Sequence, residues 1–244
     1  MNRAFSLVEL SIVLVILGLL TGGILAGQSL IRAAQLRSVT ADFRRLHTAI
    51  YAYRDKYLEL PGDHSRAFDF FSTSCGANAA ACNGNGNGLI GDTLNGVVHG
   101  EGYMAVKELA LAGLIEGSYT GLPSTPAVAG GNVIASKISN STFWFWNFKE
   151  GTYFLNGCCT TDSTAQYNWI HFGAISPGGT WPSNYSLKPE EAWNIDTKID
   201  DGKPGTGQVF GPARDQLCSD NDDRNTAAYN LSQTGIICRL GMKI

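Results

Sequence analysis

The sequence predicts an α+β fold in which one long N-terminal helix packs on an antiparallel β-sheet, with long loops between the strands. Two observations favour it. Residues 1–59 have the pattern of one continuous helix, apolar in its first half and amphipathic in its second. Residues 60–244 contain short strand-like runs separated by stretches rich in Gly, Asn, Ser and Thr. With 244 residues, 44% of them hydrophobic, the chain can bury a core and is not a disordered protein.

The helix begins with an apolar segment. Between Glu9 and Arg32 there are 22 uncharged residues, mostly Leu, Ile, Val, Ala and Gly. A run above about 18 such residues predicts a membrane-spanning helix. Arg3 and the α-amine precede the run, which favours a cytoplasmic N-terminus. Glu9 interrupts the apolar stretch, unlike the uninterrupted apolar region of a secretory signal. A signal peptide cleaved near Ala26, or a plain membrane anchor on an enzyme, is the alternative.

The second half of the helix carries an apolar stripe. Its residues follow one another at alternating steps of three and four, which is the spacing of one helix face: Leu36, Val39, Phe43, Leu46, Ile50, Tyr53 and Tyr57. We expect this face to lie on a globular head, with an intermolecular coiled coil as the alternative. Pro61 and Gly62 predict that the helix ends near Leu58. At a rise of 1.5 Å per residue, a helix from Phe5 to Leu58 is about 80 Å long.

The head is predicted to mix strands and short helices. We expect a helix over 103–112 that ends at Gly113, and a short helix after Pro189. Strands are expected at 132–138, 142–148, 152–155, 169–175, 208–210 and 235–240. The aromatic run within 143–148 is interpreted as core. Because the net charge is −3 and no basic patch accompanies these rings, we expect no nucleic-acid partner.

Six cysteines lie in the head: Cys75, Cys82, Cys158, Cys159, Cys218 and Cys238. An even number in a segment placed outside the cytoplasm predicts disulfides, and six cysteines allow fifteen connectivities. Cys75 with Cys82 would form a local bridge around a loop of small residues. Cys158 and Cys159 would pair with each other or with other partners. A zinc site is the alternative, although the C-x-x-C pairs that it needs are missing.

Signals for metal binding and catalysis are weak. Residues 83–88 alternate Asn and Gly like the first half of an EF-hand loop, but a Gly/Asn turn is favoured because the carboxylates are missing. Two groups of acids are weak candidates for a structural calcium ion, with solvated loop acids as the alternative: Asp196, Asp200 and Asp201, and Asp220, Asp222 and Asp223. The chain contains no nucleophile-elbow, phosphate-loop or zinc-protease motif. We expect no enzyme activity and no other cofactor.

The extreme N-terminus carries a specific motif. A short basic leader, the small residue Ala4 and then Phe-Ser-Leu-Val-Glu-Leu resemble the class III signal of type IV pilins and pseudopilins. The resemblance implies that a prepilin peptidase cuts between Ala4 and Phe5 and methylates the new amine of Phe5. Glu9 then becomes the fifth residue of the mature chain. The family usually has Gly where this chain has Ala4.

The resemblance also implies an organisation of the chain. Residues 1–4 are a leader peptide, 5–31 a transmembrane and assembly helix, 32–59 its amphipathic half, and 60–244 a type IV pilin-like head. Phrases such as YRDKYLELPGD and AWNIDTKIDDGKPGTG resemble heads of larger pilin-like proteins of Gram-negative bacteria. By the same resemblance, Cys218 and Cys238 would close a C-terminal disulfide loop as in many pilins. Some such heads bind calcium.

The function implied by the resemblance is that of a structural subunit of a type IV pilus or a type II secretion pseudopilus-like filament. The subunit would wait in inner-membrane lipid with its head in the periplasm. It would then polymerise with copies of itself or related subunits into a periplasmic or extracellular filament. Its further partners would be an assembly ATPase and an inner-membrane platform protein, and Glu9 would be an assembly contact. The alternatives are a minor subunit whose head binds a ligand or secreted substrate, and a membrane-tethered enzyme.

Overall fold

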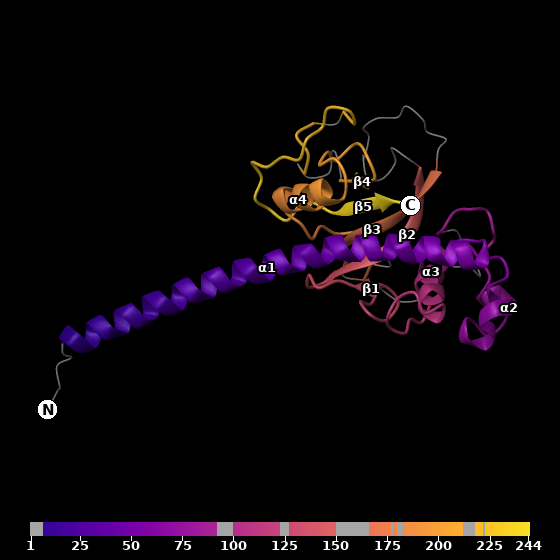
Figure 1. Cartoon of the computed structure of the whole chain (residues 1–244), viewed down its shortest axis with the longest axis horizontal. Coiled ribbons are helices and arrows are strands. Elements are labelled where there is room, and N and C mark those ends of the chain that lie inside the picture. Colours follow the sequence, from indigo (N-terminus) through magenta and orange to yellow (C-terminus); the bar gives the residue numbers. More distant parts are fainter. Residues whose placement is uncertain are drawn as a thin grey trace.

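The fold combines one very long helix with a small antiparallel sheet, so the predicted α+β class is confirmed. The computed structural model describes residues 7–91, 100–122, 127–149, 166–176, 178–179, 183–211, 218–221 and 223–244. Figure 1 shows helix α1, Leu7–Tyr57, projecting from the head with its first half and crossing the head with its second. The C-terminus lies within the head, far from the start of α1.

Helix α1 ends within one residue of the predicted position. Leu58 adopts a left-handed conformation, with φ of 63°, and its N–H donates to the carbonyl of Arg54 at 2.7 Å. This local contact caps a helix terminus whose last carbonyls have no partner within the helix. Pro61 and Gly62 follow, and Gly62 itself has a φ of 82°. The left-handed Leu58 therefore ends the helix, and the left-handed Gly62, directly after Pro61, turns the chain four residues later.

The apolar stripe of α1 packs against the sheet of the same chain. Val39, Phe43, Leu46, Ile50 and Tyr53 are fully buried. The ring of Phe43 meets the rings of two paired strand residues, at centroid distances of 5.2 Å to Phe143 and 6.1 Å to Phe172. The stripe thus covers the head core, and the alternative of an intermolecular coiled coil over these residues is wrong.

The sheet has five antiparallel strands in the order β1-β2-β3-β5-β4. Its centre is the pairing of β2, Ser141–Lys149, with β3, Gln166–Ala174. These strands confirm the predictions for 142–148 and 169–175, and β4, Val209–Phe210, confirms the one for 208–210. Phe143, Trp144 and Phe145 of β2 are fully buried, as the core interpretation requires. The strand expected at 152–155 lies outside the described residues.

Two strand predictions need correction. The run 132–138 contributes only β1, Ile134–Ala135, paired with β2. The run 235–240 is not a strand of the sheet: β5 is Leu240–Lys243 and begins where the prediction ended. Cys238 instead forms an isolated bridge with Leu187 and a disulfide with Cys218. Tertiary partners outside the sheet therefore hold the segment that was predicted to be a strand.

Short helices surround the long one. Helix α3, Gly100–Leu111, packs on β2, and Gly113 follows it with a φ of 74°. Helix α4, Pro189–Ile199, lies against α1 and is longer than predicted. Helix α2, Ala67–Phe71, and the single turns η1, Ser72–Ser74, and η2, Ala79–Ala81, follow the end of α1. Figure 1 places α4 beside the middle of α1 and α2 near its C-terminal end.

Candidate functional site

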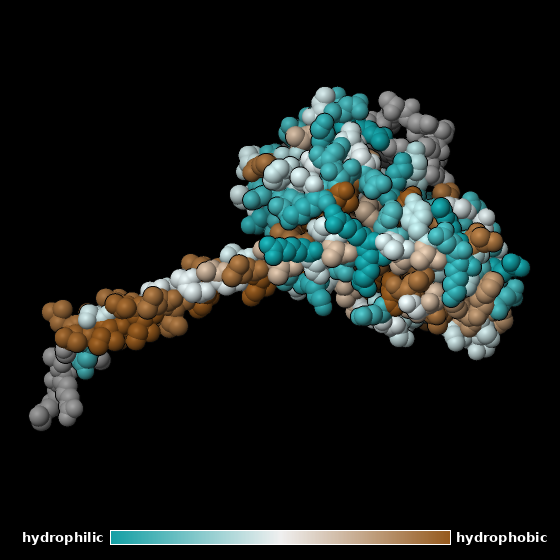
Figure 2. Space-filling view, viewed as in Figure 1, coloured by the Kyte–Doolittle hydropathy of each residue, from teal (hydrophilic) through white to brown (hydrophobic). Residues whose placement is uncertain are grey.

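The most distinctive surface of the molecule is the first half of α1. From Leu7 to Ile31, fifteen large apolar side chains are each at least half exposed. Figure 2 shows this arm as a nearly continuous hydrophobic surface that extends from a largely hydrophilic head. Soluble monomers rarely expose apolar patches larger than a few hundred Å². Among the described residues, α1 is the one helix long and apolar enough to cross a membrane.

The three hydroxyl groups within this arm are satisfied by the helix itself. The hydroxyls of Ser11, Thr21 and Ser29 donate to the carbonyls of Val8, Leu17 and Ala26, at 2.8 to 2.9 Å. In hydrocarbon an unsatisfied donor costs several kcal/mol, so only groups bonded inside the segment are tolerated there. These three hydroxyls therefore add little cost when the arm lies in an apolar environment.

Four glycines interrupt the apolar arm without breaking it. A side chain at Gly18, Gly22, Gly23 or Gly27 would meet no other atom within 4 Å, so each opens onto free surface. Helix α1 is continuous through all four. Small residues spaced four apart allow the backbones of two helices to approach closely. The arm can thus pack against other helices as well as against lipid.

Glu9 lies in the first turn of α1 and is exposed. Its neighbours Val8 and Leu10 are exposed apolar residues, so the carboxylate sits within the apolar surface. The positive end of the helix dipole favours an acid at this position. Ala4 and Phe5, the expected processing and methylation residues, lie outside the described residues.

An ion pair joins the arm to the head at the residue that follows the apolar run. Arg32 of α1 donates to Glu191 of α4 from two of its three guanidinium nitrogens, Nε to Oε1 at 2.5 Å and Nη2 to Oε2 at 2.6 Å. The same Nη2 donates to the carbonyl of Ser186 at 3.1 Å. Burial would raise the pKa of Glu191, but hydrogen bonds from Arg32 and from the Lys188 N–H hold it below its ordinary value. Bidentate pairs of this kind fix orientation.

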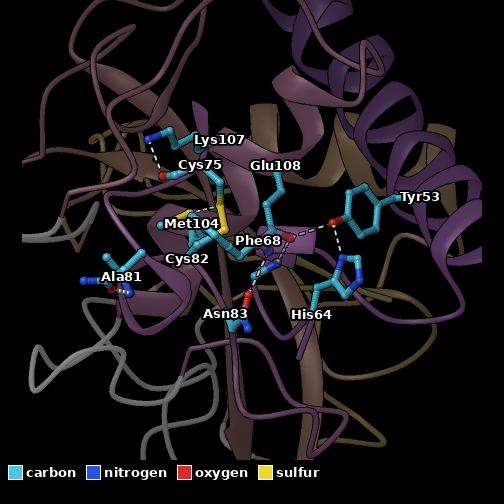
Figure 3. The surroundings of a disulfide bond; sticks show 12 residues. Tyr53, His64, Phe68, Cys75, Ala81, Cys82, Asn83, Met104, Lys107 and Glu108 are labelled. Atoms are coloured by element: carbon cyan, nitrogen blue, oxygen red, sulfur yellow. Dashed lines mark hydrogen bonds between the residues drawn. A yellow bond between two sulfur atoms is a disulfide. The ribbon is translucent and has the colours of Figure 1, made fainter. Parts of the chain in front are cut away.

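Two disulfides staple the head. Cys75 bonds to Cys82, and Cys218 bonds to Cys238, so both pairings named in the sequence analysis are formed. Figure 3 shows the first of them, beside Met104 and below Lys107, whose Nζ donates to the carbonyl of Cys75 at 2.6 Å. The described residues contain no free cysteine. Cys158 and Cys159 lie outside them.

A buried polar network adjoins the first disulfide. The hydroxyl of Tyr53 lies 2.7 Å from Nδ1 of His64 and 2.8 Å from Oε2 of Glu108, which also accepts from the Gly62 N–H at 2.8 Å (Figure 3). Burial raises the pKa of Glu108 to about 8 and lowers the pKa of His64. Both side chains are therefore neutral near pH 7. The network ties α3 to the end of α1 and is structural in character.

The structure brings the first group of acids together. Ligand atoms of Asp196, Asp200 and Asp201 lie within 4.8 Å of one another. Each carboxylate, however, accepts hydrogen bonds from the protein itself. Asp196 accepts from the Gly202 N–H and the Tyr229 hydroxyl at 3.0 and 2.7 Å.

The other two acids hold the loop that follows α4. Asp200 accepts from the backbone N–H of Val209 at 3.2 Å, and Asp201 from that of Lys203 at 2.9 Å. Burial raises the pKa of Asp196 to about 7. These bonds account for the cluster as a loop staple, and calcium binding stays a prediction. In the second group, Asp220 and Asp223 accept backbone N–H groups of their own turn, and Asp222 lies outside the described residues.

The Asn/Gly repeat of residues 83–88 forms an irregular loop in which Gly86 and Gly88 have positive φ, as the favoured interpretation of a Gly/Asn turn allows. Carboxylate oxygens of Asp63 accept from the N–H groups of Asn87 and Gly88 at 3.0 and 2.7 Å. Glu101 of α3 is fully buried, and its Oε1 accepts from the Asn85 N–H at 3.1 Å. An EF-hand loop carries its own acidic residues, whereas the acids at this loop, Asp63 and Glu101, belong to neighbouring segments. Their carboxylates accept hydrogen bonds from backbone N–H groups of the loop.

Sequence reasoning missed the groups that join one element to another. The sequence did hold a signal for the pair of Arg32 and Glu191. Arg32 is the first charged residue after the apolar run. Glu191 is three residues after Lys188, the residue at the start of the predicted helix, which is the spacing of an acid in a capping box. Glu108 had none, because an acid on an amphipathic helix normally faces water. Its burial depends on a tyrosine 55 residues earlier in the chain.

Comparison with known proteins adds no relative. No family model, no curated protein and no solved structure matches this chain. Functional inference therefore depends on the residues and geometry described above.

Proposed function

We propose that this chain is a non-enzymatic subunit of a type IV pilus or pseudopilus-like filament, held in the inner membrane by its apolar arm before assembly. One observation carries the proposal. The single helix α1 is exposed and apolar from Leu7 to Ile31, yet its second half forms the core of the head. A cleavable signal has no reason to continue as the central helix of the mature fold. Residues 1–6 supply the processing motif.

The energetics of the arm require that it always be covered. Burial of one large aliphatic side chain is worth roughly 1.5–3 kcal/mol, so the fifteen on the arm represent tens of kcal/mol. That exceeds the whole stability of a typical domain, about 5–15 kcal/mol. A subunit extracted from lipid must therefore pass its arm directly into a bundle of similar helices. The open glycines allow such close packing.

The partners follow from this cycle. A prepilin peptidase would cut before Phe5, and a platform protein with a cytoplasmic ATPase would supply the work of extraction. The head would stand in the periplasm, where its two disulfides are stable against reduction. A filament of identical or related subunits is then the product, and the head surface would be displayed along it.

Glu9 would set the register of the bundle. After cleavage Phe5 carries a positive α-amine, four residues before Glu9. The amine of an incoming subunit can meet Glu9 of the subunit before it, which neutralises both charges in a layer of low dielectric. The competing contact is intramolecular, between Glu9 and the amine of its own chain. That contact would support the helix start without directing assembly.

The test is Glu9→Gln, with Glu9→Ala beside it, expressed as the only copy in the native host. Gln keeps the volume and removes the charge. We expect normal cleavage and membrane insertion, because the arm becomes more apolar, and loss of most sheared filaments by electron microscopy and immunoblot. Glu116→Gln removes an exposed acid of the head and is expected to assemble normally. Wild-type filament yield from both Glu9 variants would defeat the proposed register contact.

In the alternative, the chain is a minor subunit of the same filament, and its abundance distinguishes it from a major subunit. Mass spectrometry of sheared filaments separates the two, since a major subunit dominates the sample and a minor one is rare within it. The described residues offer no observation that favours a membrane-tethered enzyme over either filament role.

A further inference from the structure

We propose that the groove between α1 and α4 binds the phosphate headgroup of an anionic phospholipid in the outer leaflet of the membrane that holds the arm. The proposal deepens the proposed function and depends on it, because it requires the Leu7–Ile31 segment to lie in a bilayer. The groove has a volume of about 500 Å³ and is open to solvent. Its walls come from α1 between Ser29 and Arg37, where the apolar run ends, and from α4 together with Lys188 before it.

The position of the groove follows from the length of the apolar arm. Ser29, which lines the groove, stands 20 residues after Glu9. At 1.5 Å per residue this is about 30 Å, the thickness of the hydrocarbon core. With Glu9 at the inner boundary, Ser29 therefore lies at the outer one. Arg37, eight residues further along, is then about 12 Å beyond it. The groove spans the layer in which headgroup phosphates lie.

The side chains in the groove have the charge that a phosphate needs. Arg37, Lys188 and Lys198 are exposed cations on its walls. Arg32 and Glu191 neutralise each other as the ion pair described above, which leaves Glu190 as the remaining acid of the groove. Three cations thus face one acid. Lys198 donates to Asn194 at 2.5 Å, which holds its ammonium group along the α4 wall.

The helix geometry places Arg37 and Lys198 on faces that line the same groove. On α1, Ser29, Ala33 and Arg37 are spaced four apart and share a face; on α4, Glu190, Asn194 and Lys198 do the same. The bidentate pair of Arg32 with Glu191 fixes the distance between the two helices at the membrane end. Two helices therefore build most of the groove, and Lys188 lines it from the N-cap position of α4.

The location of these cations also calls for an anionic partner. Lys and Arg are disfavoured directly after a membrane helix on the translocated side. Arg32 has its partner in Glu191, and Arg44 donates to the carbonyl of Lys198. Arg37 has no hydrogen-bond partner among the described residues, and Lys188 attracts the Glu191 carboxylate, which Arg32 already neutralises. Phosphate headgroups at that level would supply these cations with charge-assisted hydrogen bonds.

The consequence for function is that a bound lipid would hold the head against the membrane until extraction. As the subunit rises, the groove leaves the headgroup layer and the lipid must dissociate. The ease of extraction would then depend on the anionic lipid content of the leaflet.

The experiment uses the full chain, purified in detergent and mixed with equal amounts of phosphatidylglycerol and phosphatidylcholine. Native mass spectrometry counts which lipid the protein retains. The groove variant carries Arg37→Gln, Lys188→Gln and Lys198→Gln. Its matched control carries Arg66→Gln, Lys137→Gln and Lys203→Gln, three exposed cations of the same kinds elsewhere on the head. We expect wild type and control to prefer phosphatidylglycerol, and the groove variant to lose that preference by about tenfold or more.

Further outcomes decide against the proposal. An unchanged lipid preference in the groove variant would overturn it. Displacement of the lipid by excess inorganic phosphate, but not by chloride at equal ionic strength, would show that the groove binds free phosphate. That result would contradict the proposal that its ligand is a phospholipid. Unchanged lipid retention combined with loss of filaments in cells would assign the groove to a protein neighbour instead. A chain that fails to enter phosphatidylcholine vesicles at all would contradict the proposed function, so the two failures are distinguishable.

Discussion

At the scale of single residues, the head depends on an acid that is kept uncharged. Glu108 is fully buried, and its Oε1 has no hydrogen-bond partner among the described residues. Its other oxygen joins Tyr53 and the Gly62 N–H, at the point where α1 ends and the chain turns into the head. Burial is the largest cause of its raised pKa. A neutral carboxyl costs less in this site than a charged one, which loses its hydration without gaining a cation.

This predicts a stability loss as the pH rises. The folded pKa of Glu108 is about 8, above the ordinary value of 4.5, so between these values the folded state keeps a proton that the unfolded state releases. The free energy of unfolding therefore falls across this window. Glu108→Gln, neutral at every pH, should remove this part of the decline. We expect the variant to resemble wild type near pH 5 and to be more stable near pH 9, on the order of a few kcal/mol.

Urea denaturation of both proteins at the two pH values measures this difference. The buried Asp196, whose pKa is raised in the same direction, contributes equally to both proteins and cancels. Glu116→Gln, at an exposed position, controls for the loss of an acid. Parallel loss of stability in wild type and Glu108→Gln would show that Glu108 is not the group that titrates.

At the scale of elements, the two disulfides close loops of different lengths. Cys218 and Cys238 are 20 residues apart and fasten the segment before β5, whereas Cys75 and Cys82 are only 7 apart. In the chain-entropy model the longer loop contributes about 3 kcal/mol and the shorter about 2.5 kcal/mol. The longer one also places Cys238 beside Leu187, just before α4.

We therefore expect the two double Cys→Ser variants to differ. Removing Cys218 and Cys238 should lower the free energy of unfolding more than removing Cys75 and Cys82, and should also loosen α4 against α1. Chemical denaturation measures the first effect and hydrogen exchange of residues 189–199 the second. Non-reducing peptide mapping of the exported wild-type protein first establishes that both bridges are formed. A larger loss from the Cys75 and Cys82 variant would contradict this assignment.

At the scale of the whole molecule, the sequence predicts those elements whose apolar residues recur with a regular spacing. The spacing of Phe43, Leu46 and Ile50 determines which face of α1 is buried, because a helix places these residues on one side. The central strands could also be predicted from the sequence, because runs of aromatic and β-branched residues favour β-strands. Strand β5 was misplaced because a disulfide and a single bridge, both set by distant residues, hold the preceding segment outside the sheet.

One part of the candidate site can be predicted from the sequence, and the other part requires the structure. The exposed arm and Glu9 are visible in the sequence, since an acid within an apolar run stands out without any structure. The groove is not, because it requires α4 to lie beside the start of the amphipathic half of α1. That placement follows from packing of the head and from the pair of Arg32 with Glu191, whose partners are 159 residues apart.

The central claim is that the apolar arm is kept and used in assembly. The most direct measurement is mass spectrometry of the mature N-terminus in protein purified from cells. We predict a chain that begins at Phe5 with a methylated amine and retains the whole segment from Leu7 to Ile31. A mature chain that begins near Gly27 would mean that the arm is discarded as a signal peptide, and it would contradict the account.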